Sequence, residues 1–423
     1  MIDSPPSKFK YPLKTVVIAI QLVLVGLLSL RGVKRTFSIL KPYLSCSIPS
    51  HEVIQNWIMR YGLYQLRKLP ERRDDWIFIL DHSIEFGKKQ CLLILGVSKE
   101  KFLKNNCRLQ HKDMTVLATD IIESATGQSV TDSLMKVAGK TGFPAQIVSD
   151  GGSNILNGCR DFIVQNNSVQ PIRQTYDVTH KAALLLKHQL KNDTTWQSFC
   201  KKTAFSKQCL VHTELGYLAP PKPRDKARWQ NLDMYIKWAE MILSQKNQHM
   251  SKTVADKFKD KLSWVAEYKS HIKEWRTMLD ILYIVKHEVK VNGFSNKTTG
   301  IVKKEIDKLT IKSQRIQDVK FQVMSYIEKE CTGIDGVILG CSDIIESIFG
   351  KYKNFSGKSP MKEIGRAVLT IPAFTSTIDY KQVKMAMEAI SAKDVIEWQK
   401  KNIGTSLFAK RKEAFNLKKE KSR

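Results

Sequence analysis

The stretch IVSDGGSNILNG, Ile147 to Gly158, decides how the middle of the chain is interpreted. A mostly apolar run, Ala145 to Val148, leads into Asp150, two glycines follow, and an amphipathic segment begins. This order predicts a buried strand, a tight turn and a helix. An aspartate at such a point is most often a turn former or a helix cap, so Asp150 indicates chemistry only if other acidic residues lie beside it.

The segments around this stretch predict one mixed sheet. We expect strands at "WIFIL" (Trp76–Leu80), at Cys91–Val97 and at Met114–Ile122, with "HSIEFGKKQ" as a hairpin connection after Asp81. Helix, strand, helix, strand and helix then follow in "SVTDSLMKVAGKTG", "AQIVSD", "SNILNGCRDFIVQN", "PIRQTY" and "DVTHKAALLLKHQL". Three strands in hairpin order before alternating helices and strands predict an α/β fold.

The length of 423 residues predicts more than one domain. Beyond the α/β region the strand signal disappears into a long stretch rich in lysine and tryptophan, which predicts helices. The expected division is a helical domain (1–70), the first part of an α/β core (74–190), an all-helical insertion (191–330), the second part of the core (331–380) and a helical basic C-terminal segment (381–423).

The formal net charge is +28, from 69 Lys and Arg against 41 Asp and Glu. An excess of this size favours polyanionic partners, of which nucleic acid is the commonest, over a basic surface that serves solubility alone. The tail from Lys410 to Arg423 fits either a solvated helix end or non-specific phosphate contacts.

The eight cysteines form no CxxC pair, which predicts free thiols and a cytoplasmic, reducing compartment. Cys200, Cys209 and His212 do not have the spacing of a standard zinc site, so scattered core cysteines are the better interpretation. The apolar run Val16–Leu30 has 15 residues, fewer than the roughly 20 that span a bilayer, so a buried helix is favoured over a membrane anchor.

The N-terminal segment contains a candidate DNA-reading helix. Ser50 is a plausible N-cap, apolar residues follow at helical spacing, and Gln55, Asn56 and Arg60 occupy the polar side. A short amphipathic helix after a turn is typical of a helix-turn-helix domain, with Arg60 as a possible DNA contact. Many small helical domains show the same pattern without binding DNA. Because the chain reaches its apolar helix almost at once, we also expect that an upstream piece of this domain is missing.

Three acidic residues are placed where they can act together. Asp81 and Asp150 follow apolar strands, and Glu346 lies in "SDIIESIFG", a helix with Ile344, Ile345, Ile348 and Phe349 on its buried side. If the two strands are neighbours and the helix packs across the sheet, the carboxylates make an oxygen-ligand site for Mg²⁺ or Mn²⁺. Two such ions support in-line attack at phosphorus, which fits a phosphodiester substrate.

Four segments in order carry a family resemblance: "ILDHSIEFGKKQCLLILGV", "IVSDGGSNILNGCRDF", "YDVTHKAALLLK" and "CSDIIESIFGKYK". Together they resemble a bacterial insertion-sequence transposase of the DDE type, from about Asp75 to Lys353. The resemblance implies a ribonuclease H-like mixed five-stranded sheet with flanking helices, interrupted by an all-α insertion and preceded by an all-α helix-turn-helix domain.

The resemblance implies roles for particular residues. Asp81 matches the first metal-binding aspartate, Asp150 the second and Glu346 the closing glutamate. Asp343, one turn before Glu346, competes for the third role, although we expect it to cap the helix. Asp177 and His180 resemble an accessory Asp-x-x-His signature, and a helix cap explains this pair equally well.

In related transposases such an insertion holds DNA near the active site. The segment Lys226–Leu243 is the candidate here, with Arg228 and Trp229 as possible DNA contacts. Tryptophans at helical spacing are more often core residues, so a core role is the stronger alternative for Trp229.

The leading hypothesis is a DNA transposase that binds terminal inverted repeats and uses two Mg²⁺ or Mn²⁺ ions, held by Asp81, Asp150 and Glu346, for strand cleavage and strand transfer. Its partners would be the element ends and target DNA, within a homodimer or larger synaptic assembly, and no membrane. The alternatives are a non-catalytic DNA-binding protein derived from a transposase, another ribonuclease H-like nuclease, and a membrane-tethered protein.

Overall fold

The computed structural model describes residues 9–43, 47–86, 89–123, 125–222, 232–245, 251–357 and 364–420. The chain divides into two compact units, one formed by residues 1–175 with 341–423 and the other by residues 176–340. The second unit is wider at both ends than the expected insertion, residues 191–330. Each unit is described by itself.

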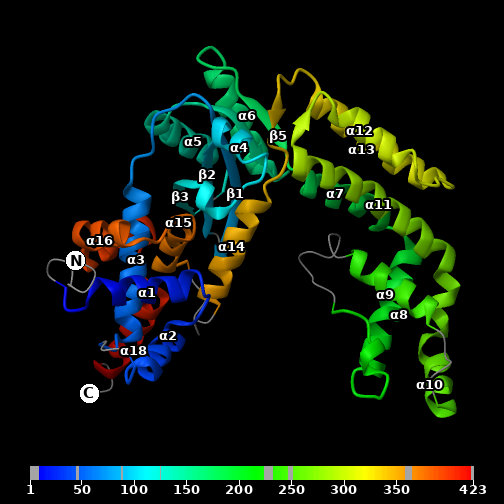
Figure 1. Ribbon diagram of the computed structural model, residues 1–423, viewed down its shortest axis with the longest axis horizontal. Coiled ribbons are helices and arrows are strands. Elements are labelled where there is room, and N and C mark those ends of the chain that lie inside the picture. The colour runs from blue at the N-terminus through cyan, green and yellow to red at the C-terminus, as the bar shows by residue number, and fades with distance from the viewer. Residues whose placement is uncertain are drawn as a thin grey trace. The chain divides into compact units, whose positions relative to one another are not determined.

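The first unit is built on a five-stranded sheet with the strand order β3-β2-β1-β4-β5 (Figure 1). The strand β1 pairs antiparallel with β2 and parallel with β4, and β2 pairs antiparallel with β3. The predicted mixed α/β sheet of five strands is thus confirmed. The strands are β1 (Trp76–Phe86), β2 (Lys89–Ser98), β3 (Thr115–Ile122), β4 (Pro144–Ser149) and β5 (Arg173–Tyr176).

One face of the sheet is covered by α5 (Gly127–Thr141) and α6 (Ser153–Asn166). Phe78 and Leu80 of β1 join residues of these helices in one hydrophobic cluster. The two helices approach closely at Gly158, where an added Cβ would lie 2.5 Å from the carbonyl oxygen of Gly127. The short elements of this region are α4 (Lys99–Lys104) and η1 (His111–Asp113).

The N-terminal helices share a core with the C-terminal ones. Buried residues of α1, α2 and α3 belong to the same hydrophobic cluster as Leu369, Phe374, Val383 and Val395, and we call this assembly the helical body. Residues 1–70 therefore do not close a core by themselves. Its elements are α1 (Leu13–Leu24), α2 (Leu30–Leu40), α3 (His51–Arg67), η5 (Arg366–Leu369), α15 (Thr370–Phe374), α16 (Tyr380–Ala389) and α17 (Ala392–Asn402), and α18 (Leu407–Glu420) follows.

The apolar run Val16–Leu30 is not one helix. The helix α1 ends at Leu24, a turn that includes Leu27 at φ 55° follows, and α2 begins at Leu30. Within the described part of the chain, no helix combines the length and apolar character needed to cross a membrane.

The second unit is mainly helical, and most of its tryptophans are core residues. Trp196 packs edge-on against Trp275, with ring centroids 4.9 Å apart, and Phe199 contacts both. The expectation of helices alone was wrong at Phe294, because two short strands pair there. The elements are α7 (Val178–Leu190), α8 (Thr194–Leu210), η2 (Gly216–Leu218), α9 (Leu232–Ser244), α10 (Lys252–Leu262), η4 (Ser263–Tyr268), α11 (Lys269–Asn292), β6 (Phe294–Ser295), α12 (Thr298–Ile306), α13 (Gln314–Cys331) and β7 (Val337–Ile338).

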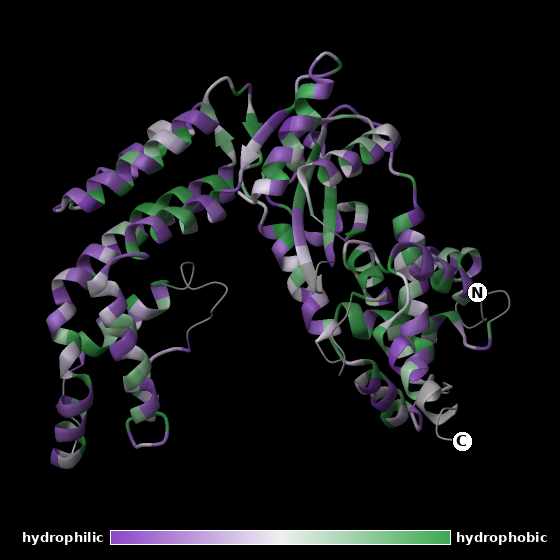
Figure 2. Ribbon diagram, turned by 180° about the vertical axis from the view of Figure 1, so that it is seen from behind, coloured by the Kyte–Doolittle hydropathy of each residue, from purple (hydrophilic) through white to green (hydrophobic). Residues whose placement is uncertain are grey.

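The distribution of hydrophobic residues agrees with this organisation. The central strands are hydrophobic along most of their length, whereas the helices alternate hydrophobic and hydrophilic residues (Figure 2). A strand buried on both faces needs apolar side chains at every position, and an amphipathic helix needs them on one side only.

Candidate active site at the sheet

Asp81 lies inside β1 rather than after it, which corrects the expected end of this strand at Leu80. The antiparallel pairing with β2 continues past Asp81, which is opposite Leu93, to Phe86. The parallel pairing with β4 ends earlier, at Leu80 opposite Ser149. Asp81, still within β1, and Asp150, directly after β4, are thus the next residues past the last pair that these two neighbouring strands share.

The alternation of side chains places Asp81 on a particular face of the sheet. Phe78 and Leu80 point into the cluster with α5 and α6, so Asp81 points to the opposite face. The helix α14 (Asp343–Ser356) packs against β1, and none of its residues belongs to the α5–α6 cluster. Asp81 and α14 therefore share a face of the sheet.

Asp150 combines a turn with a possible ligand position. Its Oδ1 accepts a hydrogen bond from the backbone N–H of Gly152 at 3.1 Å, and α6 begins at Ser153. Asp150 is therefore a turn former, as an aspartate after a strand most often is. The hydrogen bond also orients the half-buried carboxylate, so the turn and a metal-binding role are compatible.

The helix α14 presents two acidic residues in its first turn. Asp343 was expected as the N-cap, but the cap is Ser342 and Asp343 is the first helical residue. Asp343 is half-buried and Glu346 is exposed, beside a buried stripe at helical spacing. A hydrogen bond of 3.0 Å between Nε2 of His111 and Oγ of Ser347 attaches this turn to η1. The stripe that holds α14 in place consists of Ile345, Ile348, Phe349 and Tyr352.

The electrostatic surroundings argue against other catalytic groups at this place. Burial lowers the pKa of His82, and the charge of Asp150 only partly offsets this effect. Burial raises the pKa of Cys159 to about 12, with a smaller contribution from Asp150, so this thiol stays protonated at neutral pH. His82 and Cys159 also belong to the α5–α6 side of the sheet, opposite Asp81. The carboxylates are the groups suited to hold a hard cation.

The pair Asp177 and His180 forms a helix cap in the second unit. The buried Asp177 is the N-cap of α7, and its Oδ1 accepts hydrogen bonds from the backbone N–H of His180 at 2.7 Å and from its Nδ1 at 3.0 Å. The local structure is thus the capping alternative, and an accessory catalytic role stays a prediction.

The candidate DNA-reading helix α3 is internal to the helical body. The Arg60 guanidinium donates hydrogen bonds to the carbonyl oxygens of Met387 and Ile390, and it lies 4.5 Å from the Phe9 ring centroid. Gln55 accepts a hydrogen bond from Arg366 at 3.1 Å. Arg60 therefore stabilises helix packing, and the DNA contact expected of it stays a prediction.

The remaining predicted residues give no further site. Arg228 and Trp229 lie outside the described residues. Among the residues that are described, Cys200, Cys209 and His212 do not bring their ligand atoms within reach of one ion. The same holds for Asp81, Asp150 and Glu346, whose carboxylate oxygens do not all lie within 4.8 Å of one another.

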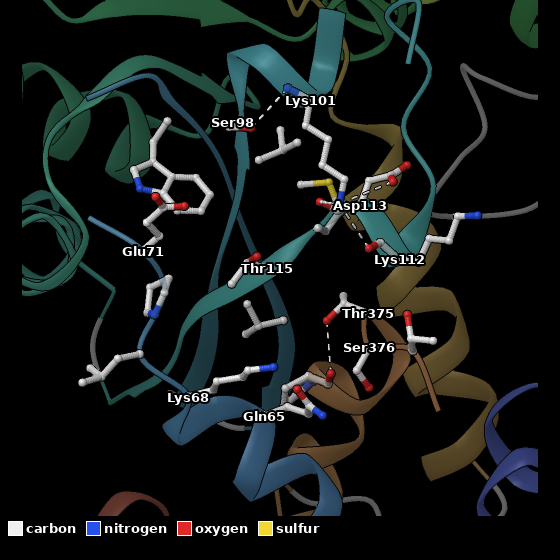
Figure 3. Close-up of a pocket in the computed structure, with 18 of the residues that line it drawn as sticks. Gln65, Lys68, Glu71, Ser98, Lys101, Lys112, Asp113, Thr115, Thr375 and Ser376 are labelled. Atoms are coloured by element: carbon white, nitrogen blue, oxygen red, sulfur yellow. Dashed lines mark hydrogen bonds and ion pairs between the residues drawn. The ribbon is translucent and has the colours of Figure 1, made fainter. Parts of the chain in front are cut away.

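A separate cavity of about 420 Å³ lies at the other end of the sheet. Its walls come from the beginning of β1, the end of β2, η1 and the helical body. Lys101 and Asp113 lie on one side and Gln65 and Lys68 on another (Figure 3). Trp76 lines it, five residues before Asp81, or roughly 17 Å along an extended strand. The cavity is therefore separate from the carboxylates. Its residues come from segments so far apart in the sequence that no sequence motif could have predicted it.

Comparisons with known proteins give only remote likenesses. No protein-family model and no curated protein matches the sequence. Among solved structures, the chain is similar to the Drosophila P element transposase strand transfer complex, with 13% identity, 90% of this chain and 92% of that chain covered, and a TM-score of 0.37. It is also similar to a simian T-cell lymphotropic virus intasome in complex with PP2A regulatory subunit B56 gamma, with 12% identity, 55% and 72% covered, and a TM-score of 0.18. Likenesses this weak carry no weight for function.

Proposed function

We propose that the chain is a DNA transposase that cleaves and joins phosphodiester bonds, with Asp81, Asp150 and Glu346 as its metal-binding carboxylates. The observation that carries this proposal is the strand register. The last parallel pair of β1 and β4, Leu80 opposite Ser149, directly precedes Asp81 and Asp150, and α14 packs against β1.

The chemistry of these donors fits Mg²⁺ or Mn²⁺, which prefer carboxylate oxygens. Such ions, when bound as a pair, supply charge stabilisation for in-line displacement at phosphorus. The protein's own contribution is positional. Asp81 is held within an 11-residue strand, Asp150 by the hydrogen bond from Gly152, and Glu346 by the buried stripe of α14.

The formal charge of +28 supports a polyanionic substrate. Binding of terminal inverted repeats, strand transfer into target DNA and a synaptic dimer or larger assembly belong to the proposal. So does an origin in an insertion sequence.

Nicking of a supercoiled plasmid that contains candidate element ends tests the proposal. We expect nicking by the whole protein with Mn²⁺ or Mg²⁺, none with EDTA, and loss of nicking in Asp150→Asn. The matched control is Asp120→Asn, because Asp120 lies in the same sheet on the α5–α6 face.

Two outcomes would overturn the catalytic proposal. One is salt-dependent duplex binding without cleavage in either metal, which would select the non-catalytic alternative. The other is an Asp150→Asn variant that nicks as fast as the original chain. Cleavage of RNA in a hybrid duplex, with DNA left intact, would select another ribonuclease H-like nuclease.

A further inference from the structure

The chain from Ser4 to His51 contains no acidic residue. Asp3 and Glu52 flank this segment, which is positive throughout in a chain that otherwise mixes both signs. Its cations are Lys8, Lys10, Lys14, Arg31, Lys34, Arg35 and Lys41.

The helix α2 collects three of these cations on its solvent side. Arg31, Lys34, Arg35 and Ser38 are exposed and follow the i, i+3, i+4, i+7 spacing of one helical stripe. The opposite side carries Val33 and Phe37, which are buried in the helical body. We call the four exposed residues the α2 stripe.

The helix α2 is held in place at its beginning, and the three cations of the α2 stripe are exposed to solvent. Ser29 caps its beginning by accepting a hydrogen bond from the backbone N–H of Gly32 at 3.0 Å. No ion pair within the described ranges involves Arg31, Lys34 or Arg35. This distinguishes the stripe from cations such as Arg73, which pairs with Asp75 and Glu100.

We propose that the α2 stripe is a docking surface for duplex DNA, with Arg31, Lys34 and Arg35 on phosphates. The choice of duplex DNA as the polyanion rests on the proposed function, whereas the surface itself is given by exposure and charge. An 11-residue helix is about 16 Å long, and the major groove, about 12 Å wide, admits a helix.

The exposed apolar residues beside the stripe fit the same partner. Ile39 is 69% exposed at the end of α2, and Tyr43 is 81% exposed just after it. A DNA groove offers sugar and thymine methyl groups to such side chains. The proposal transfers the DNA-binding role from α3, where the sequence pattern placed it, to α2.

Fluorescence anisotropy with a labelled mixed-sequence duplex of about 30 base pairs, over a series of salt concentrations, tests this surface. The variant is Lys34→Gln with Arg35→Gln in the whole protein, without divalent metal. Each lost phosphate contact lowers the slope of log K against log salt by about 1, so we expect a fall of about 2 and a binding loss of tenfold or more.

The matched control is Lys400→Gln with Lys401→Gln, which removes two exposed cations from α17 in the same unit. We expect its affinity to stay within about threefold of the original chain. An equal loss in both variants would overturn the proposal in favour of a general positive field. Unchanged duplex binding by the α2 variant, with an altered oligomeric state in sedimentation, would also overturn it and assign the stripe to a protein partner.

The two proposals fail in different ways. Protein that binds duplex through the α2 stripe but never nicks contradicts the proposed function and leaves this inference intact. If the nicking rate depends on DNA concentration in the same way for the original chain and for the α2 variant, the inference is contradicted. The proposed function is then left intact. Thermal melting of both variants, with midpoints close to that of the original chain, establishes that they are folded.

Discussion

The strands that carry or precede Asp81 and Asp150 differ from the helical body in how much of their packing the sequence predicts. Asp81 and Asp150 come together because two strands pair in parallel and stop pairing at the same point. Which side of α3 faces solvent depends instead on helices more than 300 residues later in the sequence. These helices cover the side of α3 that carries its polar residues. Local patterns thus predict which residues follow the last pairs of neighbouring strands, but they do not show which side of a helix faces solvent.

The largest effect should separate the two acids of α14. Glu346→Gln should reduce nicking by about a hundredfold or more if Glu346 is the third ligand, because the displacement step would lose a metal ligand. Asp343→Asn, on the same turn, should reduce it by less than about tenfold. Single-turnover nicking rates at saturating Mn²⁺ measure both.

The reverse ranking would assign the third role to Asp343, which is the more buried of the two. It would also show that the likeness of "IIESIFGKYK" to a transposase motif misled the choice. Melting temperatures near that of the original chain are required for either conclusion.

The second effect tests whether α3 is a buried helix. An added Cβ at Gly62 would lie 1.8 Å from the carbonyl oxygen of Leu369, so Gly62→Ala forces α3 away from η5 and α15. We expect a loss of about 3 kcal/mol in the free energy of unfolding, measured by urea denaturation. The control is Gly139→Ala in α5, where nothing lies within 4 Å. It should stabilise the protein by about 0.8 kcal/mol. A tolerated Gly62→Ala would contradict the packing of the helical body.

Most of the sheet could be predicted because each strand carries its own signal. Runs such as "WIFIL" and "CLLILGV" are apolar at successive positions, as strands buried on both faces require. The adjacency of the first three strands follows from their hairpin order, whereas the pairing of β1 with β4 is known only from the structure. The extension of β1 beyond Asp81 was missed because His82 and Ser83 are polar. Pairing with β2 holds them in the strand, and only the register shows this.

The helical body could not be predicted as a unit because its core joins distant segments. Nothing in residues 51–66 shows that Arg60 donates to carbonyl groups at the end of α16. The α2 stripe had a usable signal, namely the acid-free segment from Ser4 to His51 with its cations at helical spacing. The adjacent apolar run Val16–Leu30 instead favoured a buried helix for this part of the chain.

The third effect asks whether Arg60 serves packing or DNA. Arg60→Ala removes two charge-assisted hydrogen bonds to backbone carbonyl oxygens, and we expect a loss of about 2 kcal/mol in the free energy of unfolding. The salt dependence of duplex binding should not change. Lys34→Ala, on the exposed side of α2, should give the opposite result: little change in stability and a slope lower by about 1. An Arg60→Ala variant that is fully stable but binds DNA with a reduced slope would restore α3 as the reader.

The smallest effect concerns the attachment of α17 to α3. Hydrogen bonds from the Ser391 side chain and backbone, with a smaller contribution from Arg67 of α3, lower the pKa of Asp394 to about 2. Because the folded pKa is depressed, the stabilisation is present above the unfolded value, about 3.9, and is lost as the pH falls through about 2.

Asp394 keeps 32% of its side-chain surface exposed, so solvent screening limits its contribution. Asp394→Asn should therefore reduce the free energy of unfolding by about 0.5 to 1 kcal/mol at pH 6. The difference between the variant and the original chain should shrink as the pH falls from about 4 to about 2, because the original carboxyl becomes protonated over this range. Urea denaturation of both proteins from pH 6 to pH 2 measures it. A difference that stays constant over this range would mean that the charge of Asp394 does not hold α17, leaving the apolar contacts of the helical body to attach this helix.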